Sequence, residues 1–120
     1  MELWTGVDAV EIERIAKSMR REGFLQRYFG PEELEYFASR GNAPQTVAGH
    51  FAAKEAFSKA MGTGIRGFAL KEVGIVHDRM GRPSFLLSGA AGELCGARRL
   101  SLSITHTGET ATAFVVAWEE

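Results

Sequence analysis

The sequence has a single cysteine, only three prolines and no long uninterrupted hydrophobic run. Because Cys95 has no second cysteine to pair with, an intramolecular disulfide is excluded, which is typical of a reducing compartment. No stretch approaches the roughly 18 consecutive apolar residues of a membrane-spanning helix, and residues 1–4 do not begin a secretory leader. We therefore expect a cytoplasmic protein that does not enter a membrane.

Neither sign of charge dominates the chain. Fourteen Lys and Arg residues stand against 15 Asp and Glu residues, so the formal net charge is −1. A field over the whole protein that would attract nucleic acid or an anionic membrane is therefore excluded, and charged recognition must be local. With 120 residues, the chain is long enough for one hydrophobic core and too short for two ordinary domains. We expect one domain, residues 1–120.

Hydrophobic periodicity predicts a mixture of helices and strands without regular βαβ alternation. Alternating or β-rich stretches predict strands at residues 3–10, 69–77, 84–87, 100–105 and 111–118. Helical spacing predicts helices at residues 11–19, from residue 31 to about 38, at 46–61 with Thr46 as its cap, and at 90–98. The pattern indicates an α+β fold, in which a mainly antiparallel sheet packs against the long helix 46–61.

Two carboxylates stand among small or apolar neighbours. Asp8 lies between Val7 and Ala9 near the end of the first strand, and Glu55 lies in an alanine-rich part of the long helix. A buried carboxylate needs a cation or hydrogen-bond donors, and a pair of them can hold Mg²⁺ together with phosphate oxygens. A simpler alternative for Glu55 is a salt bridge with Lys59, four residues along the same helix.

A glycine-rich loop follows this helix and could receive a phosphate group. Gly62, Thr63 and Gly64 offer backbone amides and a hydroxyl, and Lys59 lies one turn earlier. The spacing is not that of a Walker motif, and a glycine-capped helix end explains the same residues. His106 and Thr107 are expected at the exposed tip of the last hairpin, where a turn histidine without a chemical role also fits. His77 is given no role.

The first helix is basic although the whole chain is not. Arg14, Lys17 and Arg21 are three or four residues apart and can share one surface. This surface is either an ordinary solvated face or a binding face for an acidic partner.

Three segments resemble the holo-acyl-carrier-protein synthase family, 4'-phosphopantetheinyl transferases of the stand-alone bacterial type. They are TGVDAVEIERI at residues 5–15, FAAKEAFSKAMGTGI at 51–65 and LSITHT at 102–107. The middle segment is the most specific, and the order, spacing and chain length agree with the family. The turn Gly-Arg-Pro at 81–83 falls where the family has its own turn.

The resemblance implies a magnesium-dependent transfer. Coenzyme A would donate its phosphopantetheine to a serine of an acyl carrier protein, and adenosine 3',5'-bisphosphate would leave. Asp8 and Glu55 would bind Mg²⁺, which neutralises the pyrophosphate, and Lys59 would assist catalysis and hold phosphates. The base that takes the serine proton is left open between a metal-bound water and one of the carboxylates.

The family also implies which residues would contact coenzyme A. The expected contacts are Lys59, Gly62, Thr63, Gly64, Gly81, Arg82, Pro83, His106, Thr107 and His50. His50 stands where the family usually has arginine, and a neutral imidazole would make a weaker phosphate contact. Members of the family are usually trimers with sites between subunits, and Phe114, Val116 and Trp118 would cover either the core or a neighbouring subunit. Because acyl carrier proteins are acidic, Arg14, Lys17 and Arg21 would dock the partner.

Two other classes of function fit the residues without the resemblance. A non-catalytic module that binds acidic helices would need only the basic face, with structural roles for Asp8 and Glu55. Another metal-dependent nucleotide enzyme could use the same carboxylates with a different acceptor. The first alternative predicts that binding survives the loss of both carboxylates, whereas only substrate tests distinguish the second.

Overall fold

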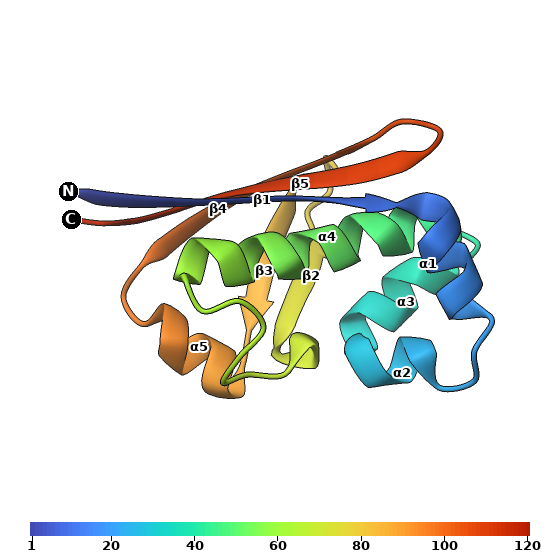
Figure 1. Cartoon of the computed structure of the whole chain (residues 1–120), viewed down its shortest axis with the longest axis horizontal. Coiled ribbons are helices and arrows are strands. Elements are labelled where there is room, and N and C mark those ends of the chain that lie inside the picture. Colours follow the sequence, from blue (N-terminus) through green and yellow to red (C-terminus); the bar gives the residue numbers. More distant parts are fainter.

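A three-stranded antiparallel sheet covers the long helix α4 (Figure 1). The computed structural model describes all 120 residues and confirms the α+β class, with the strand order β1-β5-β4 and a separate hairpin β2-β3 beside α4. None of the helices combines the length and the apolar composition that a membrane crossing requires. The strands are β1 (Glu2–Glu11), β2 (Val73–His77), β3 (Pro83–Leu87), β4 (Arg99–His106) and β5 (Thr110–Glu119).

The helices fall into two groups around α4. Helices α1, α2 and α3 gather at one end of α4, and α5 lies near the other end (Figure 1). Their bounds are α1 (Ile12–Met19), α2 (Phe24–Tyr28), α3 (Pro31–Ser39), α4 (Pro44–Met61) and α5 (Gly89–Cys95), with a short 3-10 helix, η1 (Leu70–Glu72), before β2.

Most expected elements are present, and three details of the prediction were wrong. Helix α4 begins at Pro44, which suits a first helical turn, so Thr46 lies inside the helix and does not cap it. Strand β2 begins at Val73 because η1 replaces the start of the expected strand; there the Glu72 side chain accepts a hydrogen bond from the Ala69 amide at 3.0 Å. The short helix α2 was not predicted.

Strand β1 packs directly on α4 because the residues between them are small. A Cβ atom on Gly6 would overlap the carbonyl oxygen of Ala56 and lie 2.7 Å from the amide nitrogen of Ala60. Ala56 and Ala60 are themselves buried, and Ala113 of β5 is fully buried in the same core cluster. This close approach brings the α4-facing side of β1, including Asp8, against the helix.

The opposite face of the sheet exposes large apolar side chains. Leu3, Val7 and Phe114 are 62%, 54% and 44% exposed. Val7 pairs with Phe114, and Leu3 pairs with Trp118. Side chains alternate across a strand, so these residues lie on the side of the sheet away from α4. The sheet therefore has one face in the core and one apolar face without a cover in this chain.

A buried polar cluster joins α4 to α3 and β2. The Lys54 amine is fully buried and donates to Glu33 Oε1 at 2.6 Å, to the Leu70 carbonyl at 3.0 Å and to the Val73 carbonyl at 2.7 Å. Three acceptors match the three protons of an ammonium group. Because removing one partner would leave a buried charge uncompensated, this cluster fixes the mutual positions of these elements.

Candidate active site

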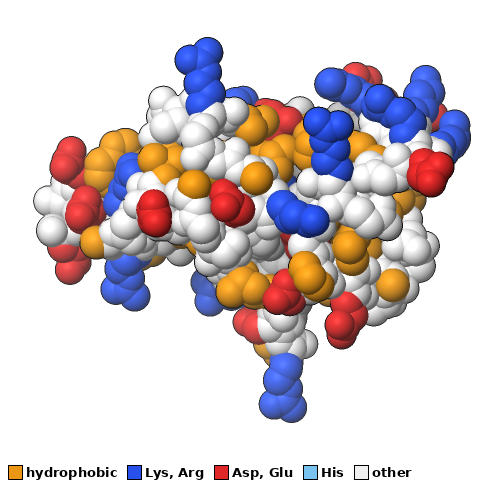
Figure 2. All heavy atoms as spheres, turned by 90° about the horizontal axis from the view of Figure 1, so that it is seen from below, with side chains coloured by type: hydrophobic (Ala, Val, Ile, Leu, Met, Phe, Trp, Pro, Cys, Tyr) orange, Lys and Arg blue, Asp and Glu red, His pale blue; other side chains and the backbone are white.

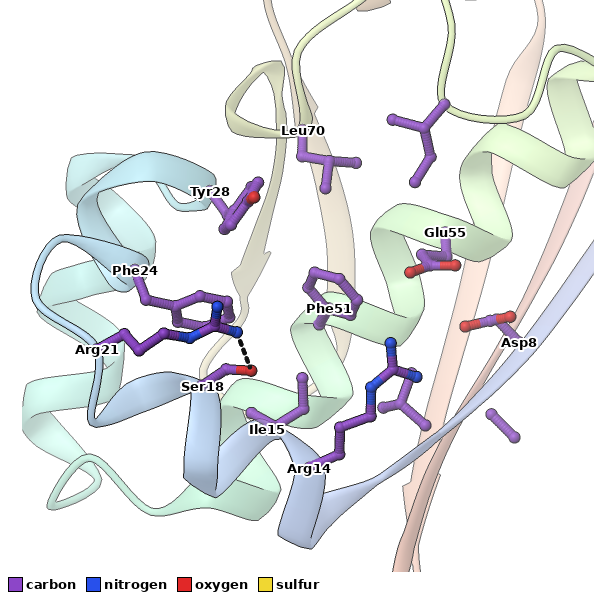
Figure 3. A pocket seen from close by; sticks show the side chains of 13 residues that line it. Asp8, Arg14, Ile15, Ser18, Arg21, Phe24, Tyr28, Phe51, Glu55 and Leu70 are labelled. Atoms are coloured by element: carbon purple, nitrogen blue, oxygen red, sulfur yellow. Dashed lines mark hydrogen bonds between the residues drawn. The ribbon is translucent and has the colours of Figure 1, made fainter.

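A cavity of about 550 Å³ opens where β1, α1, α2 and α4 meet. Asp8 of β1 and Glu55 of α4 face one another at one end of it, and Arg14 of α1 points toward them (Figure 3). Phe24 and Tyr28 of α2 line the other end. The cavity therefore joins a polar end with two carboxylates to an apolar end.

Lys59 pairs with Asp8. Its amine donates to Asp8 Oδ1 at 2.8 Å and to the Val7 carbonyl at 3.0 Å, and the bond to Asp8 with its negative charge raises the pKa of Lys59. The alternative salt bridge between Glu55 and Lys59 is not formed, because β1 lies close enough to α4 for Asp8 to pair with Lys59 instead. The Asp8 side chain is 12% exposed.

Glu55 lies in an environment that disfavours its charge. Burial raises the pKa of Glu55, and the nearby negative charge of Asp8 raises it further. The positive charges of Lys59 and Arg14 act in the opposite direction and are the weaker influences on this pKa. The carboxyl group therefore keeps its proton to a higher pH than an ordinary glutamate, and an additional positive charge beside it would favour ionisation.

The two carboxylates suit a hard divalent cation. Lys59 occupies one oxygen of Asp8, and the other Asp8 oxygen and both Glu55 oxygens accept no hydrogen bond from the chain. No cluster of three or more His, Cys, Asp or Glu side chains could hold a metal ion. A cation held by two carboxylates keeps its other positions for water or phosphate oxygens, which is the usual arrangement for Mg²⁺ in phosphate-binding sites.

The other residues expected to bind coenzyme A lie outside this cavity. Gly62, Thr63 and Gly64 follow α4, where Gly62 caps the helix in the left-handed conformation with φ of 78°. The turn 81–83 ends the β2-β3 hairpin, and His106 and Thr107 are exposed at the β4-β5 hairpin. None of these residues lines the cavity that contains Asp8 and Glu55.

His50, which was expected to contact the ligand, lies buried and away from the cavity that contains Asp8 and Glu55. Its side chain is 2% exposed; its Nδ1 lies 2.8 Å from Glu33 Oε2 and its Nε2 lies 2.9 Å from His77 Nε2. The imidazole lies between α3 and β2, and it does not reach the cavity. His50 is therefore part of the buried polar cluster of this chain.

The apolar end of the cavity was missed by the sequence analysis. Phe24 and Tyr28 pack edge to face with ring centroids 5.3 Å apart, and the ring centroids of Tyr28 and Phe51 are 6.4 Å apart. The separation of four residues between Phe24 and Tyr28 is a helical signal that indicates a shared face. Because α2 has only five residues, this signal is too short to stand out from the surrounding charged segment.

The fold and the carboxylate site define a class of enzyme. Residues 5–117 match the family model of the 4'-phosphopantetheinyl transferase superfamily, and the chain belongs to this superfamily. Among its relatives is the holo-[acyl-carrier-protein] synthase of Geotalea daltonii, which is 46% identical over 118 residues, covering 93% of this chain and 94% of that protein.

Solved structures agree with this placement. The crystal structure of holo-[acyl-carrier-protein] synthase from Neisseria meningitidis superimposes with a TM-score of 0.86 at 40% identity, covering 97% of this chain and 98% of that one. The Helicobacter pylori enzyme of the same name, in complex with coenzyme A, has a TM-score of 0.84 at 32% identity, covering 95% of this chain and 99% of that one. The resemblance found in the sequence is confirmed.

Proposed function

We propose that this chain transfers the 4'-phosphopantetheine group of coenzyme A to a serine of apo acyl carrier protein and releases adenosine 3',5'-bisphosphate. The pairing of Asp8 and Glu55 across β1 and α4 carries the proposal, because the site offers carboxylate oxygens for a cation that binds phosphate. The names of the relatives and the coenzyme A complex of the Helicobacter pylori enzyme support it.

Intact mass spectrometry tests this proposal directly. The protein would be incubated with Mg²⁺, coenzyme A and an apo acyl carrier protein, and the carrier protein should gain the mass of one phosphopantetheine group. A carrier protein whose modified serine is replaced by alanine should gain none. An unchanged mass of the wild-type carrier protein would refute the assignment.

Asp8 and Glu55 are the residues that would hold Mg²⁺. The bound ion would neutralise charge on the pyrophosphate of coenzyme A and on the leaving bisphosphate. The Lys59 side chain is 54% exposed, and its amine beside Asp8 would contact the same phosphates. The amides of Gly62, Thr63 and Gly64 would extend this contact. Transfer then depends mainly on positioning and electrostatics, as in other phosphoryl transfers.

We further propose that coenzyme A is bound between two copies of the chain in a trimer. The turn 81–83, His106 and Thr107 lie outside the carboxylate cavity, so one chain does not gather all the expected contacts. The exposed apolar face around Leu3, Val7 and Phe114 provides a surface that a second copy could cover. His106 of one chain would then act with Asp8 and Glu55 of another.

Light scattering should show a trimer, and Phe114→Glu should dissociate it because the substitution places a charge in an apolar contact. Leu86→Glu is a matched control, since Leu86 is 46% exposed on the hairpin strand β3. Mixing the inactive variants Asp8→Asn and His106→Ala should restore part of the activity. A fully active monomer would contradict a site shared between chains.

The basic face of α1 is the proposed docking surface for the carrier protein. Figure 2 shows Lys and Arg side chains gathered at the end of the molecule that contains α1 and α2. Arg21 donates a hydrogen bond to Ser18 Oγ at 3.3 Å. Arg14 and Arg21 both line the cavity. An acidic helix bound here would bring its serine to the cavity opening. Because Arg14 also faces Glu55, Lys17 and Arg21 are the better residues for testing docking alone.

Reversing Lys17 and Arg21 to glutamate should raise the KM for the carrier protein about tenfold, since exposed charges each contribute modestly and steer the encounter. The KM for coenzyme A should change little. The effect should shrink with added salt, because the Debye length is about 8 Å at physiological ionic strength. Lys71→Glu, on the exposed part of η1, is the control. An unchanged carrier-protein KM in the double variant would exclude this docking surface.

We place this reaction in the cytoplasm. Cys95 is free and buried, and burial raises the pKa of its thiol, so the thiolate that reacts with oxidants is disfavoured. A chain stabilised without disulfides is suited to a reducing compartment.

A further inference from the structure

Two histidines form a continuous hydrogen-bonded line from a buried carboxylate to the β2-β3 turn. His50 Nδ1 lies 2.8 Å from Glu33 Oε2, and His50 Nε2 lies 2.9 Å from His77 Nε2. His77 Nδ1 lies 3.3 Å from the carbonyl oxygen of Gly81. The line therefore connects α3, α4 and β2 to the turn that carries Gly81, Arg82 and Pro83.

The partners along this line determine how many protons the two rings carry. Glu33 Oε2 and the Gly81 carbonyl only accept, so both Nδ1 atoms must donate. Between the two Nε2 atoms exactly one proton fits, because two lone pairs or two N–H groups would repel. All three bonds together need three ring protons. Two neutral imidazoles carry only two protons on their ring nitrogens. The complete line therefore holds one extra proton and one positive charge.

The environment favours His77 as the carrier of that charge. His50 is 1% exposed, and burial lowers the pKa of its imidazole despite the opposing effect of Glu33. His77 is only half-buried and opens to a groove lined by Glu32 and Glu35. The Tyr36 ring lies parallel to the His77 ring at 4.0 Å, an arrangement that favours a cation on its face.

The other charged groups around the two rings are few and identifiable. Lys54 of α4 shares Glu33 with His50, so its charge disfavours a second positive charge on His50. Arg40 lies 5.3 Å from the Tyr36 ring. The carboxylate of Asp78, the next residue after His77, accepts the amides of Met80 and Arg82 at 2.9 Å and holds the same turn.

We propose that His50 and His77 act as one proton-binding site, which takes up one proton and not two in the folded protein and thereby ties the β2-β3 turn to α3 and α4. Without this proton only two of the three bonds can be made, and the longest of them, from His77 Nδ1 to the Gly81 carbonyl oxygen at 3.3 Å, is the one that is lost. The pair is a pH-sensitive link between the turn and the helices. This link does not require the turn to bind coenzyme A.

NMR titration of the imidazoles tests this site in the unmodified protein. The chain has three histidines, and His106 is exposed at the β4-β5 hairpin, so it is an internal reference. The His50 and His77 signals should move with one common midpoint, and the Gly81 amide signal should move with them. The proposal would be overturned if both rings became fully protonated in separate steps in the folded protein. It would also be overturned if the Gly81 amide signal did not move with pH.

The variant His77→Phe keeps a ring beside Tyr36 and removes both nitrogens. It should abolish the common step, take up one proton fewer per chain than the wild type in a potentiometric titration, and leave the Gly81 amide insensitive to pH. In the same titration His106→Phe, the matched control, should keep the common step, and the reference signal should disappear. An unchanged His50 titration in His77→Phe would show that the two rings are independent and would overturn the proposal.

Discussion

Replacing Glu55 with glutamine is expected to lower kcat/KM at least about 100-fold while leaving the protein folded. This corresponds to about 2.7 kcal/mol of lost transition-state stabilisation. The substitution keeps the size of the side chain and removes one of the two carboxylates at the polar end of the cavity. Asp8→Asn should have a similar effect and should also leave Lys59 without its charged partner. Steady-state kinetics with coenzyme A and apo carrier protein would measure both losses.

Two further measurements separate loss of the cation from loss of the fold. Glu93→Gln makes the same chemical change on the exposed side of α5 and should keep wild-type activity. Chelation should stop the wild type, and added Mg²⁺ should restore it, whereas Glu55→Gln should recover little at any Mg²⁺ concentration. Near-normal turnover by either carboxylate variant would refute their assignment as the metal site.

Gly6→Ala is expected to reduce the free energy of unfolding by more than about 3 kcal/mol, above the usual range for overpacking. The added methyl group would overlap the Ala56 carbonyl oxygen, and backbone atoms cannot rotate away as a side chain can. Strand β1 would have to move off α4, and Asp8, two residues further along, would move away from Glu55. Urea denaturation would measure the loss of stability, and activity should fall even where the variant remains folded.

Two other glycines provide controls for this prediction. Gly108→Ala places its methyl group in open space and should change stability by less than about 0.5 kcal/mol. In Gly49→Ala the added methyl group meets only the Cγ2 methyl group of Ile104, at 2.9 Å, and the loss of stability should fall between those of the other two variants. A Gly6→Ala variant as stable as the Gly108 control would show that β1 and α4 do not need their close contact.

The sequence predicted those features that depend on local pattern. The alanine-rich run before Gly62 identified α4, and the alternation around residues 100–105 identified β4. Asp8 and Glu55 were found because a carboxylate among small or apolar neighbours needs a partner. The alternative that paired Lys59 with Glu55 is not the pairing observed, since a pattern within one helix cannot show that Gly6 brings another strand within reach.

The features that depend on tertiary packing were not predictable in this way. Glu33 and Lys54 are charged residues in helices, and charged residues usually face solvent, yet here they pair at 2.6 Å in the interior. His77 was given no role, and His50 was assigned to a ligand. Their contact links positions 27 residues apart, and no periodicity within either segment indicates it.

The pairing of β1 with β5 also determines when the site can form. Strand β1 has β5 as its only strand partner, and the two are paired from Glu2 with Glu119 to Glu11 with Thr110. Contacts between such distant segments require closure of a long loop, which slows folding. During synthesis, β1 has no strand to pair with until residues 110–119 leave the ribosome. Asp8 is therefore held in its place beside Glu55 only after residues 110–119 have been made.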